Sequence, residues 1–568
     1  MVFPTNVRAL NDPPSWRMVN TPSNGISPFV REKLNSLQAD ESITVIVQLR
    51  PQANLSVEKN LTRSEQLSSV VRTLKVTANS TQRSIKRFLR VQSRRGTVKS
   101  FTPFWIFNGF SITATPAVIE KLSKRADVLS ISLDEIDVVP VSAFSLYLSN
   151  PEQNITLVSA PLLWSMGYTG QGVVVASLDS GVDLNHPDLT GRWRGGANSW
   201  FDPFGQHPDS PVDLSGHGTL TMGVMLGGDA GGTSVGVAPD AQWIAARIFN
   251  DQGASTATAI HQSYQWLLDP DNNPATADAP QVVNNSWTFA TPGCNLEFEP
   301  DLQALRSAGI LPIFAAGNSG PNANTSLSPA NNPSAFAVGA INNGSVIYGL
   351  SSRGPTSCSD SVGVFPDLVA PGVNINSTDI GGFYSTSSGT SLSAPHVSGG
   401  LALLLSAYPN LSVLQQELVL QSSAVDLGAG GPDDTYGYGR MDLLAAYQLL
   451  ANANASAVFH IGDLDAVSSP AGGATWNATV TMTVHDENEN LLSGVKVYLK
   501  WSTGSPRIDN CITDVGGVCT VSKEVSTSQD SIILVVSNAT KTQFTYQAGA
   551  NHDPDGDSNG VFITLSKP

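Results

Sequence analysis

Three polar residues, far apart in the sequence, have the types and neighbours that nucleophilic catalysis needs. Asp179 ends the apolar run at residues 173–178, His217 lies among glycines and threonines, and Ser391 precedes the apolar run at residues 401–405. A hydroxyl nucleophile needs a base that accepts its proton, and the base needs an acid that orients it. Serine, histidine and aspartate are the residue types that fill these roles together.

The expected secondary structure would place these side chains at the ends of elements. We predict that Ser391 begins a helix, where unpaired N–H groups and the helix dipole suit a nearby oxygen anion. Pro395 is then tolerated in the first turn. Asp179 would lie at the carboxyl end of a strand, where open α/β sheets build their sites. Asn318 ends a second apolar strand, and its amide can donate to an oxyanion. Taken singly, the serine could be a helix N-cap, the histidine a core residue and the aspartate a turn residue.

The order Asp179, His217, Asn318 and Ser391, with its glycine-rich flanks, resembles the subtilisin-like serine peptidases over roughly residues 155–450. The resemblance implies that Ser391 attacks the substrate, His217 transfers the proton, Asp179 fixes the imidazole tautomer and Asn318 stabilises the oxyanion. It also implies an α/β fold with a parallel-sheet catalytic domain.

The same resemblance indicates which residues would bind substrate: Gly253, Ala254, Ser255, Ser286, Trp287, Thr288, Ala316 and Gly317. The first three match a strand that pairs with the substrate backbone, which would make recognition a β-strand addition. The other five match two walls of the primary specificity pocket. Thr288 stands where the family usually has glycine.

Composition and charge narrow the class of protein. The 568 residues are 41% hydrophobic and 14% charged, with a net charge of −16, as expected for a folded globular protein. No run of 18 apolar residues is present, so we expect no membrane span. Residues 1–140 carry 19 Lys and Arg against 11 Asp and Glu, whereas the remainder carries 12 against 36. The acidic balance argues against nucleic acid as a partner, and the opposite charges favour docking of the two parts.

The pattern along the chain predicts four regions. Residues 1–42 read as a disordered lead-in, and residues 43–140 as a β-α-β-β-α-β, ferredoxin-like α+β domain that resembles the subtilisin propeptide. By resemblance it would assist folding and inhibit the enzyme, and the linker at residues 137–152 would be cut. Residues 141–455 would form the peptidase domain. Residues 456–568 alternate in polarity, which predicts an all-β, immunoglobulin-like sandwich.

Four cysteines allow three pairings. Cys511 and Cys519 flank a hairpin turn signal, so we predict that they pair across two strands, which leaves Cys294 to pair with Cys358. Free buried cysteines are the alternative. An even number of cysteines without CxxC spacing favours an oxidising compartment and therefore secretion, although the first residues lack the pattern of a signal peptide.

An acidic loop in the last region predicts a structural calcium site, with Asp553, Asp555 and Asp557 as ligands. The loop is not an EF-hand, because Thr564 stands where a bidentate glutamate is needed. A solvated acidic turn is the alternative. No cofactor is expected for catalysis.

Two function classes remain open. The first is a secreted, monomeric serine endopeptidase that is made as a self-processed zymogen, cleaves proteins or peptides, and is inhibited by its own propeptide. The second is a non-catalytic binding protein on a peptidase scaffold. The intact set of four residues favours the first.

Overall fold

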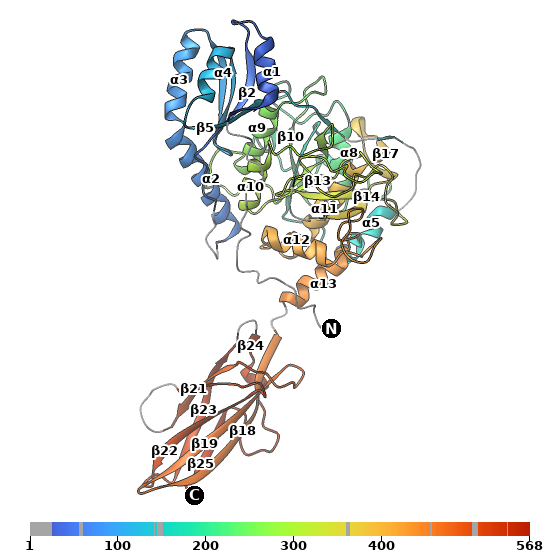
Figure 1. Cartoon of the computed structure of the whole chain (residues 1–568). Coiled ribbons are helices and arrows are strands. Elements are labelled where there is room, and N and C mark those ends of the chain that lie inside the picture. Colours follow the sequence, from blue (N-terminus) through green and yellow to red (C-terminus); the bar gives the residue numbers. More distant parts are fainter. Residues whose placement is uncertain are drawn as a thin grey trace. The chain divides into compact units, whose positions relative to one another are not determined.

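The computed structural model describes residues 25–55, 61–140, 143–144, 152–358, 364–454, 457–502, 509–541 and 544–568. The chain divides into two compact units, Met1–Leu449 and Leu450–Pro568 (Figure 1). The division falls inside helix α13 (Leu443–Asn454), a few residues before the domain boundary that we predicted at residue 456.

The first unit begins with a five-stranded sheet flanked by helices. Its strands are β1 (Gly25–Ile26), β2 (Ile43–Leu49), β3 (Val98–Phe104), β4 (Gly109–Ala114) and β5 (Val128–Leu133), in the order β1-β5-β2-β4-β3. Its helices are α1 (Pro28–Ser36), α2 (Arg63–Thr81), α3 (Arg83–Arg94) and α4 (Pro116–Ser123). The strand order and the antiparallel pairing of β2 with β4 and β5 confirm the ferredoxin-like fold.

Two details of this domain differ from the sequence-based prediction. Part of the predicted disordered lead-in is structured, because β1 pairs with β5 and α1 packs Val30 and Leu34 into the core. The first helix of the predicted β-α-β-β-α-β order is divided into α2 and α3 at Gln82, whose buried side-chain amide donates to the carbonyl of Phe104 and to the side chain of Asn108. A buried amide needs such partners.

Strand β2 serves two hydrophobic cores. Val45 and Val47 are completely buried in the core of the ferredoxin-like domain. Ile46 points to the opposite face, as strand geometry requires, and belongs to a larger core that includes residues of the peptidase domain. The two domains therefore share a continuous apolar interface.

The peptidase domain is built on a seven-stranded sheet in which every neighbouring pair is parallel. In spatial order its strands are β15 (Leu368–Pro371), β14 (Phe336–Ile341), β13 (Leu311–Ala315), β11 (Val282–Asn285), β8 (Val174–Asp179), β10 (Gln242–Arg247) and β9 (Trp200–Phe201). The remaining helices are α5 (Gln153–Leu157), α6 (Ala160–Ser165), α7 (Pro187–Thr190), α8 (His217–Leu226), α9 (Ala257–Leu268), α10 (Glu299–Ser307), α11 (Thr390–Ala407) and α12 (Val413–Ser422). The predicted parallel-sheet fold is confirmed.

Helix α11 is the centre of this domain. All of its residues from Thr390 to Leu405 are buried, and it packs against β11, β13, β14 and helix α8. The apolar run at residues 401–405 covers every side of the helix, so this part must be buried on every side. Two short ladders complete the domain, formed by β6 (Val138–Pro140) with β12 (Trp287–Phe289), and by β16 (Ile375–Thr378), β17 (Tyr384–Ser388) and β7 (Ala143–Phe144).

The second unit is a sandwich of two four-stranded sheets, as predicted. One sheet has the order β22 (Val518–Ser526), β19 (Thr475–Asp486), β18 (Ala457–Gly472) and β24 (Phe544–Tyr546). The other has the order β21 (Asp509–Ile512), β20 (Lys496–Trp501), β23 (Ser531–Thr540) and β25 (Phe562–Ser566). Alternate residues of β19 are buried in one core between the sheets.

Both predicted disulfides are present, Cys294–Cys358 and Cys511–Cys519. The second differs from the paired hairpin that we expected. Cys511 lies in β21 and Cys519 in β22, and these strands belong to different sheets, so the bond joins the two halves of the sandwich. Among the described residues, no helix combines the length and apolar character needed to cross a membrane.

Candidate active site

Asp179 and His217 form a buried hydrogen-bonded pair at the carboxyl end of β8, an interior strand of the sheet. Asp179 is the last residue of β8 and His217 the first residue of α8. The Nδ1 atom of His217 lies 2.7 Å from Oδ1 of Asp179, and the two residues are 6% and 1% exposed. Because a carboxylate only accepts, Nδ1 carries the proton, and Nε2 has the lone pair that a general base requires.

A glycine allows this close approach of helix α8 to the strand end. A Cβ atom on Gly218 would lie 2.0 Å from the carbonyl oxygen of Gly181, so no other residue fits without a shift of the backbone. The small residues around His217 therefore allow close packing of the helix on the strand end, which lets the histidine reach Asp179.

Ser391 and Asn318 lie on two segments that hydrogen bonds join. Ser391 is the second residue of α11 and is fully buried. Asn318 follows β13, and its Oδ1 atom accepts hydrogen bonds from the backbone N–H of Thr390 at 3.1 Å and from its hydroxyl at 3.0 Å. These two donors fix which end of the amide carries the N–H groups. The acceptor oxygen of Asn318 therefore faces the residue that precedes Ser391, and its Nδ2 group is not used by Thr390.

Pro395 lies deeper in helix α11 than we predicted. The helix begins at Thr390, so Pro395 is its sixth residue and cannot donate the usual hydrogen bond to the carbonyl of Ser391. The hydroxyl of Ser286 donates to that carbonyl instead, at 2.9 Å. Ser286 thus compensates for the proline and ties the backbone of Ser391 to the segment that follows β11.

The two predicted walls of the specificity pocket leave neighbouring strands on the same side of the sheet. Strands β11 and β13 are parallel neighbours, and residues 286–288 and 316–317 follow them directly. Gly317 has a φ of 102° and donates from its N–H to the hydroxyl of Thr390. A Cβ atom there would lie 2.2 Å from Leu327, so this wall requires glycine.

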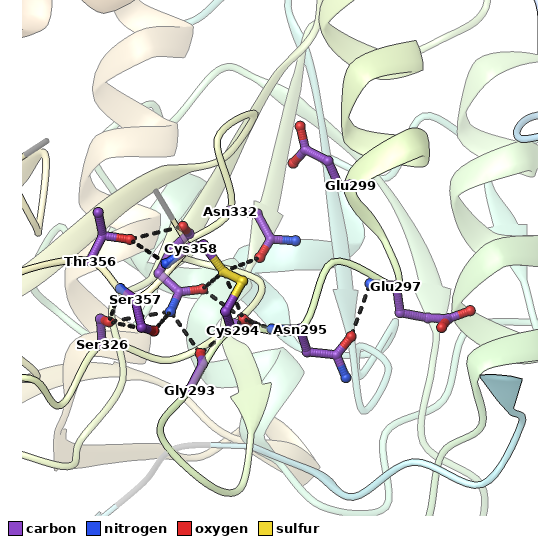
Figure 2. The surroundings of a disulfide bond; sticks show 12 residues. Gly293, Cys294, Asn295, Glu297, Glu299, Ser326, Asn332, Thr356, Ser357 and Cys358 are labelled. Atoms are coloured by element: carbon purple, nitrogen blue, oxygen red, sulfur yellow. Dashed lines mark hydrogen bonds between the residues drawn. A yellow bond between two sulfur atoms is a disulfide. The ribbon is translucent and has the colours of Figure 1, made fainter. Parts of the chain in front are cut away.

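The disulfide Cys294–Cys358 fastens the loop that continues from the Ser286–Thr288 wall (Figure 2). Around it, the side-chain amide of Asn331 donates to the carbonyl of Gly293 at 2.9 Å, and the backbone N–H of Asn295 donates to the hydroxyl of Ser328 at 2.8 Å. The bond and its polar surroundings hold this loop against the segments that precede and follow β14.

The tail of the ferredoxin-like domain is paired with both sides of the segment around Ser391. On one side β6 runs antiparallel to β12, with Val139 opposite Thr288 and Pro140 opposite Trp287. On the other side β7 pairs with β17, with Ala143 opposite Ser388, three residues before Ser391. Residues 141–142 lie outside the described residues.

The predicted substrate strand Gly253–Ser255 is less regular. Gly253 has a φ of 75°, and Asn250 and Ala254 are joined by a backbone hydrogen bond, so the segment forms a turn. Within the described residues, its ladder contact with the propeptide tail is an isolated bridge one residue later, between Thr256 and Glu135. A role for these three residues in binding substrate stays a prediction.

Comparison with known proteins places this geometry in a family. The subtilase family matches residues 170–439, and the peptidase inhibitor I9 family matches residues 44–136. The chain therefore belongs to the subtilase family of serine endopeptidases and carries an I9 inhibitor domain before its peptidase domain.

Three of the similar proteins come from Bacillus species. Subtilisin NAT of Bacillus subtilis subsp. natto is 33% identical over 347 residues, which cover 61% of this chain and 82% of that protein. Subtilisin of Bacillus pumilus is 36% identical over 296 residues, covering 52% and 98% respectively. Bacillopeptidase F of Bacillus subtilis (strain 168) is 33% identical over 420 residues, or 68% of this chain, but the match spans only 29% of that longer protein.

The predicted calcium ligands lie in two overlapping acidic groups of the second unit. Oxygen atoms of Asp463, Asp553 and Asp555 lie within 4.8 Å of one another, as do those of Asp465, Asp555 and Asp557. Burial and the neighbouring carboxylates raise the pKa of Asp463. Asp463 and Asp465 were not predicted, although their spacing places both on one face of β18.

Proposed function

We propose that Ser391 is the nucleophile of a serine endopeptidase, with His217 as its general base, Asp179 as the acid that orients the base, and Asn318 as an oxyanion donor. The observation that carries the proposal is the 2.7 Å bond between Asp179 and His217, which begins helix α8, a helix that packs against α11. This bond selects the tautomer in which Nε2 can accept the hydroxyl proton of Ser391.

The test is the reaction of the purified protein with a serine-directed fluorophosphonate. Ser391→Ala should abolish labelling and the cleavage of casein, whereas the matched control Ser393→Ala, two residues further along the same helix, should keep both. Labelling of Ser391→Ala at the wild-type level would refute the assignment. A non-catalytic binding protein, the alternative function, would not be labelled in any form.

Asn318 is tested by a separate measurement. Asn318→Ala should lower kcat roughly 10²–10³-fold, the usual cost of one oxyanion donor. A change confined to KM would instead mean that Asn318 only binds substrate.

We propose further that the ferredoxin-like domain is an inhibitory propeptide that the enzyme itself removes. The tail residues before and after residues 141–142 are paired with the two strands that flank the start of α11. A chain held on both sides of a nucleophile is placed as a substrate would be. The bond that is cut would therefore lie between Pro140 and Ala143, a narrower range than the linker predicted from the sequence.

Sequencing of the mature protein tests this proposal. The wild type should show a new N-terminus at Val141, Ser142 or Ala143, and Ser391→Ala should remain uncut. Full activity of an uncut chain would contradict the proposal of a zymogen. A new N-terminus outside this range would show that the paired tail is not the segment that is cleaved.

The ferredoxin-like domain also contacts the peptidase domain away from its paired tail, which supports an inhibitor with a second binding surface. Phe107 packs on the ring of His261 in α9 with a centroid distance of 4.4 Å. Burial opposes the charge on His261, but the adjacent Asp301 raises its pKa to about 9, so this ring is protonated at neutral pH. Lys75 forms an ion pair with the buried Asp269, which is one place where the opposite charges of the two parts meet.

We infer that the protein is secreted and monomeric and that it holds structural calcium. The two disulfides support an oxidising compartment.

The calcium site is tested by thermal unfolding. Added CaCl₂ should raise the unfolding temperature of the second unit in the wild type and in the control Asp509→Asn, but not in Asp555→Asn, whose carboxylate belongs to both acidic groups. If millimolar calcium does not change the unfolding temperature of the wild type, the acidic loop is a solvated turn and not a calcium site.

A further inference from the structure

Three histidines and one glutamate converge in the β-sandwich unit. One ligand atom from each of His460, His485, Glu489 and His552 lies within 4.8 Å of the other three. Three of the eight histidines of the chain are in this unit, and all three belong to the group. The acidic groups described above contain none of these four residues.

Backbone structure brings the four side chains together. His460 in β18 stands directly opposite His485 in β19, so the two side chains project from the same face of the sheet. Glu489 follows four residues after His485, in the turn after β19. His552 comes from the loop after η2 (Ala548–Ala550), and its backbone N–H donates to the carbonyl of Ile461 at 3.1 Å.

The spacing of the donor atoms suits a tetrahedral metal ion. Oxygen atoms of Glu489 lie 3.4 Å from Nε2 of His460, 3.0 Å from Nδ1 of His485 and 3.5 Å from Nε2 of His552. Around a zinc ion with bonds of about 2.0–2.1 Å, neighbouring ligand atoms of a tetrahedron are roughly 3.3–3.4 Å apart. The distances from Glu489, measured from Oε1 to His460 and from Oε2 to His485 and His552, lie close to that spacing, and all four ligand atoms lie within 4.8 Å of one another.

Surrounding atoms orient two of the rings. The Nδ1 atom of His552 lies 3.3 Å from the carbonyl oxygen of Ala550, which favours a proton on Nδ1 and a lone pair on Nε2. The pairing of β18 with β19 shifts between Ile461 and Asp463, which leaves Gly462 in a bulge. A Cβ atom on Gly462 would lie 2.2 Å from Nδ1 of His485, so the imidazole occupies space that only glycine provides.

The buried member of the group, His460, has a ring nitrogen whose hydrogen bonding the described residues do not satisfy. His460 is 5% exposed, and its buried Nε2 makes no hydrogen bond to any described residue, although it faces Glu489. A buried polar atom normally has a hydrogen-bond partner or binds an ion, and a bound metal ion would satisfy Nε2 of His460. The side chains of His552 and Glu489 are 41% and 59% exposed, which gives an ion access from solvent.

We propose that His460, His485, Glu489 and His552 bind a zinc ion. Imidazole nitrogen is a donor for zinc and its transition-metal neighbours, whereas calcium and magnesium prefer oxygen ligands. The set of three histidines and one carboxylate supplies four protein ligands, as in a closed structural site. The ion would join the loop at His552 to strands β18 and β19 and would stabilise the second unit.

The test measures zinc bound to the full chain after treatment with EDTA and dialysis against ZnCl₂. Glu489→Gln and His552→Ala change exposed ligands, so they should preserve the fold. The matched control is Glu524→Gln, which alters a glutamate of β22 that is bonded to Thr475. The wild type and the control should retain one zinc per chain more than either variant, with an affinity at least about 100-fold higher. Zinc should raise the unfolding temperature of the second unit in the wild type and not in the variants.

Two further measurements separate this site from others. Gly462→Ala keeps all four ligands but displaces the ring of His485, so it should also lose the additional zinc. Co²⁺ in place of zinc should give the strong visible bands of a four-coordinate ion in the wild type and in Glu524→Gln, but not in Glu489→Gln, His552→Ala or Gly462→Ala. CaCl₂ should not compete with zinc. Equal zinc uptake by the wild type, Glu489→Gln and His552→Ala would overturn the proposal.

Discussion

Asp134 of the propeptide completes the N-terminus of a helix in the peptidase domain, and its removal should release inhibition. The first N–H groups of a helix have no partner within the helix. At the start of α9, the N–H of Ala257 donates to the backbone carbonyl of Asp134 at 3.1 Å, and the N–H of Thr258 donates to its carboxylate at 2.7 Å. The hydroxyl of Thr258 donates to the same carboxylate oxygen at 2.6 Å. The positive end of the helix dipole favours this negative charge.

The size of the effect follows from these bonds. Asp134 is 9% exposed, so the bonds of its carboxylate are largely protected from water. A hydrogen bond to a charged group contributes about 1.5–3 kcal/mol, and the loss of two coupled bonds at one oxygen should cost about 2–3 kcal/mol. Since 1.4 kcal/mol corresponds to a tenfold change, Asp134→Ala should weaken propeptide binding roughly 30- to 150-fold. Asp134→Asn, which retains an acceptor but loses the charge, should have a smaller effect.

The assay is inhibition of the mature peptidase by added propeptide, residues 25–140, with a chromogenic peptide as substrate. Glu135→Gln is the matched control, because Glu135 is the next carboxylate along the chain and its ion pair with Lys33 is exposed. That control should change the inhibition constant less than about fivefold. Equal inhibition by the wild type, Asp134→Ala and Glu135→Gln would refute the capping argument. Circular dichroism of each propeptide in complex with the peptidase checks that the variants fold.

Three other changes test parts of the peptidase domain. Ser286→Ala should lower the free energy of unfolding by about 1–3 kcal/mol, measured by thermal denaturation, because the carbonyl of Ser391 loses its donor. Burial lowers the pKa of His396 from 6.5 to about 4, so its contribution to stability is present above pH 6.5 and is lost as the pH falls toward 4. That pKa difference corresponds to about 3 kcal/mol, and urea denaturation between pH 7 and 4 should show a flatter pH dependence for His396→Gln. Replacing Cys294 and Cys358 by alanine opens a loop with a sequence separation of 64 and should cost about 4 kcal/mol, seen as a lower unfolding temperature.

The catalytic-domain fold could be predicted because its signals are local and redundant. Continuous apolar strands, each followed by a glycine-containing loop, occur at Asp179 and again at Asn318. In a parallel sheet such loops meet at one edge, so the chain order alone brings the two residues near each other. The strand alternation in the second unit was equally readable, and the two-sheet sandwich followed from it.

Other features depend on partners that no local pattern reveals. The helix division at Gln82 coincides with bonds from its side-chain amide to Phe104 and Asn108 across the domain, whereas the surrounding residues have ordinary helix propensity. The ordered lead-in was missed because β1 has two residues and is held by its pairing with β5 rather than by its own sequence. Tertiary contacts decided both cases.

The four proposed zinc ligands are likewise brought together by tertiary structure that no local sequence pattern reveals. The acidic loop predicts Asp553 as a metal ligand because oxygen donors alternate within a few residues. The adjacent His552, in contrast, has its partners 63 or more positions earlier in the chain. What brings His460 to His485 is the register of one antiparallel pair, and a slip of one residue would send one ring to the opposite face. The bulge at Gly462 lies two residues after His460, where it makes room for the ring of His485. A rule based on spacing along the sequence cannot predict this arrangement, because the ligands are neighbours across strands. The only sign of it in the sequence is that three histidines occur in one domain.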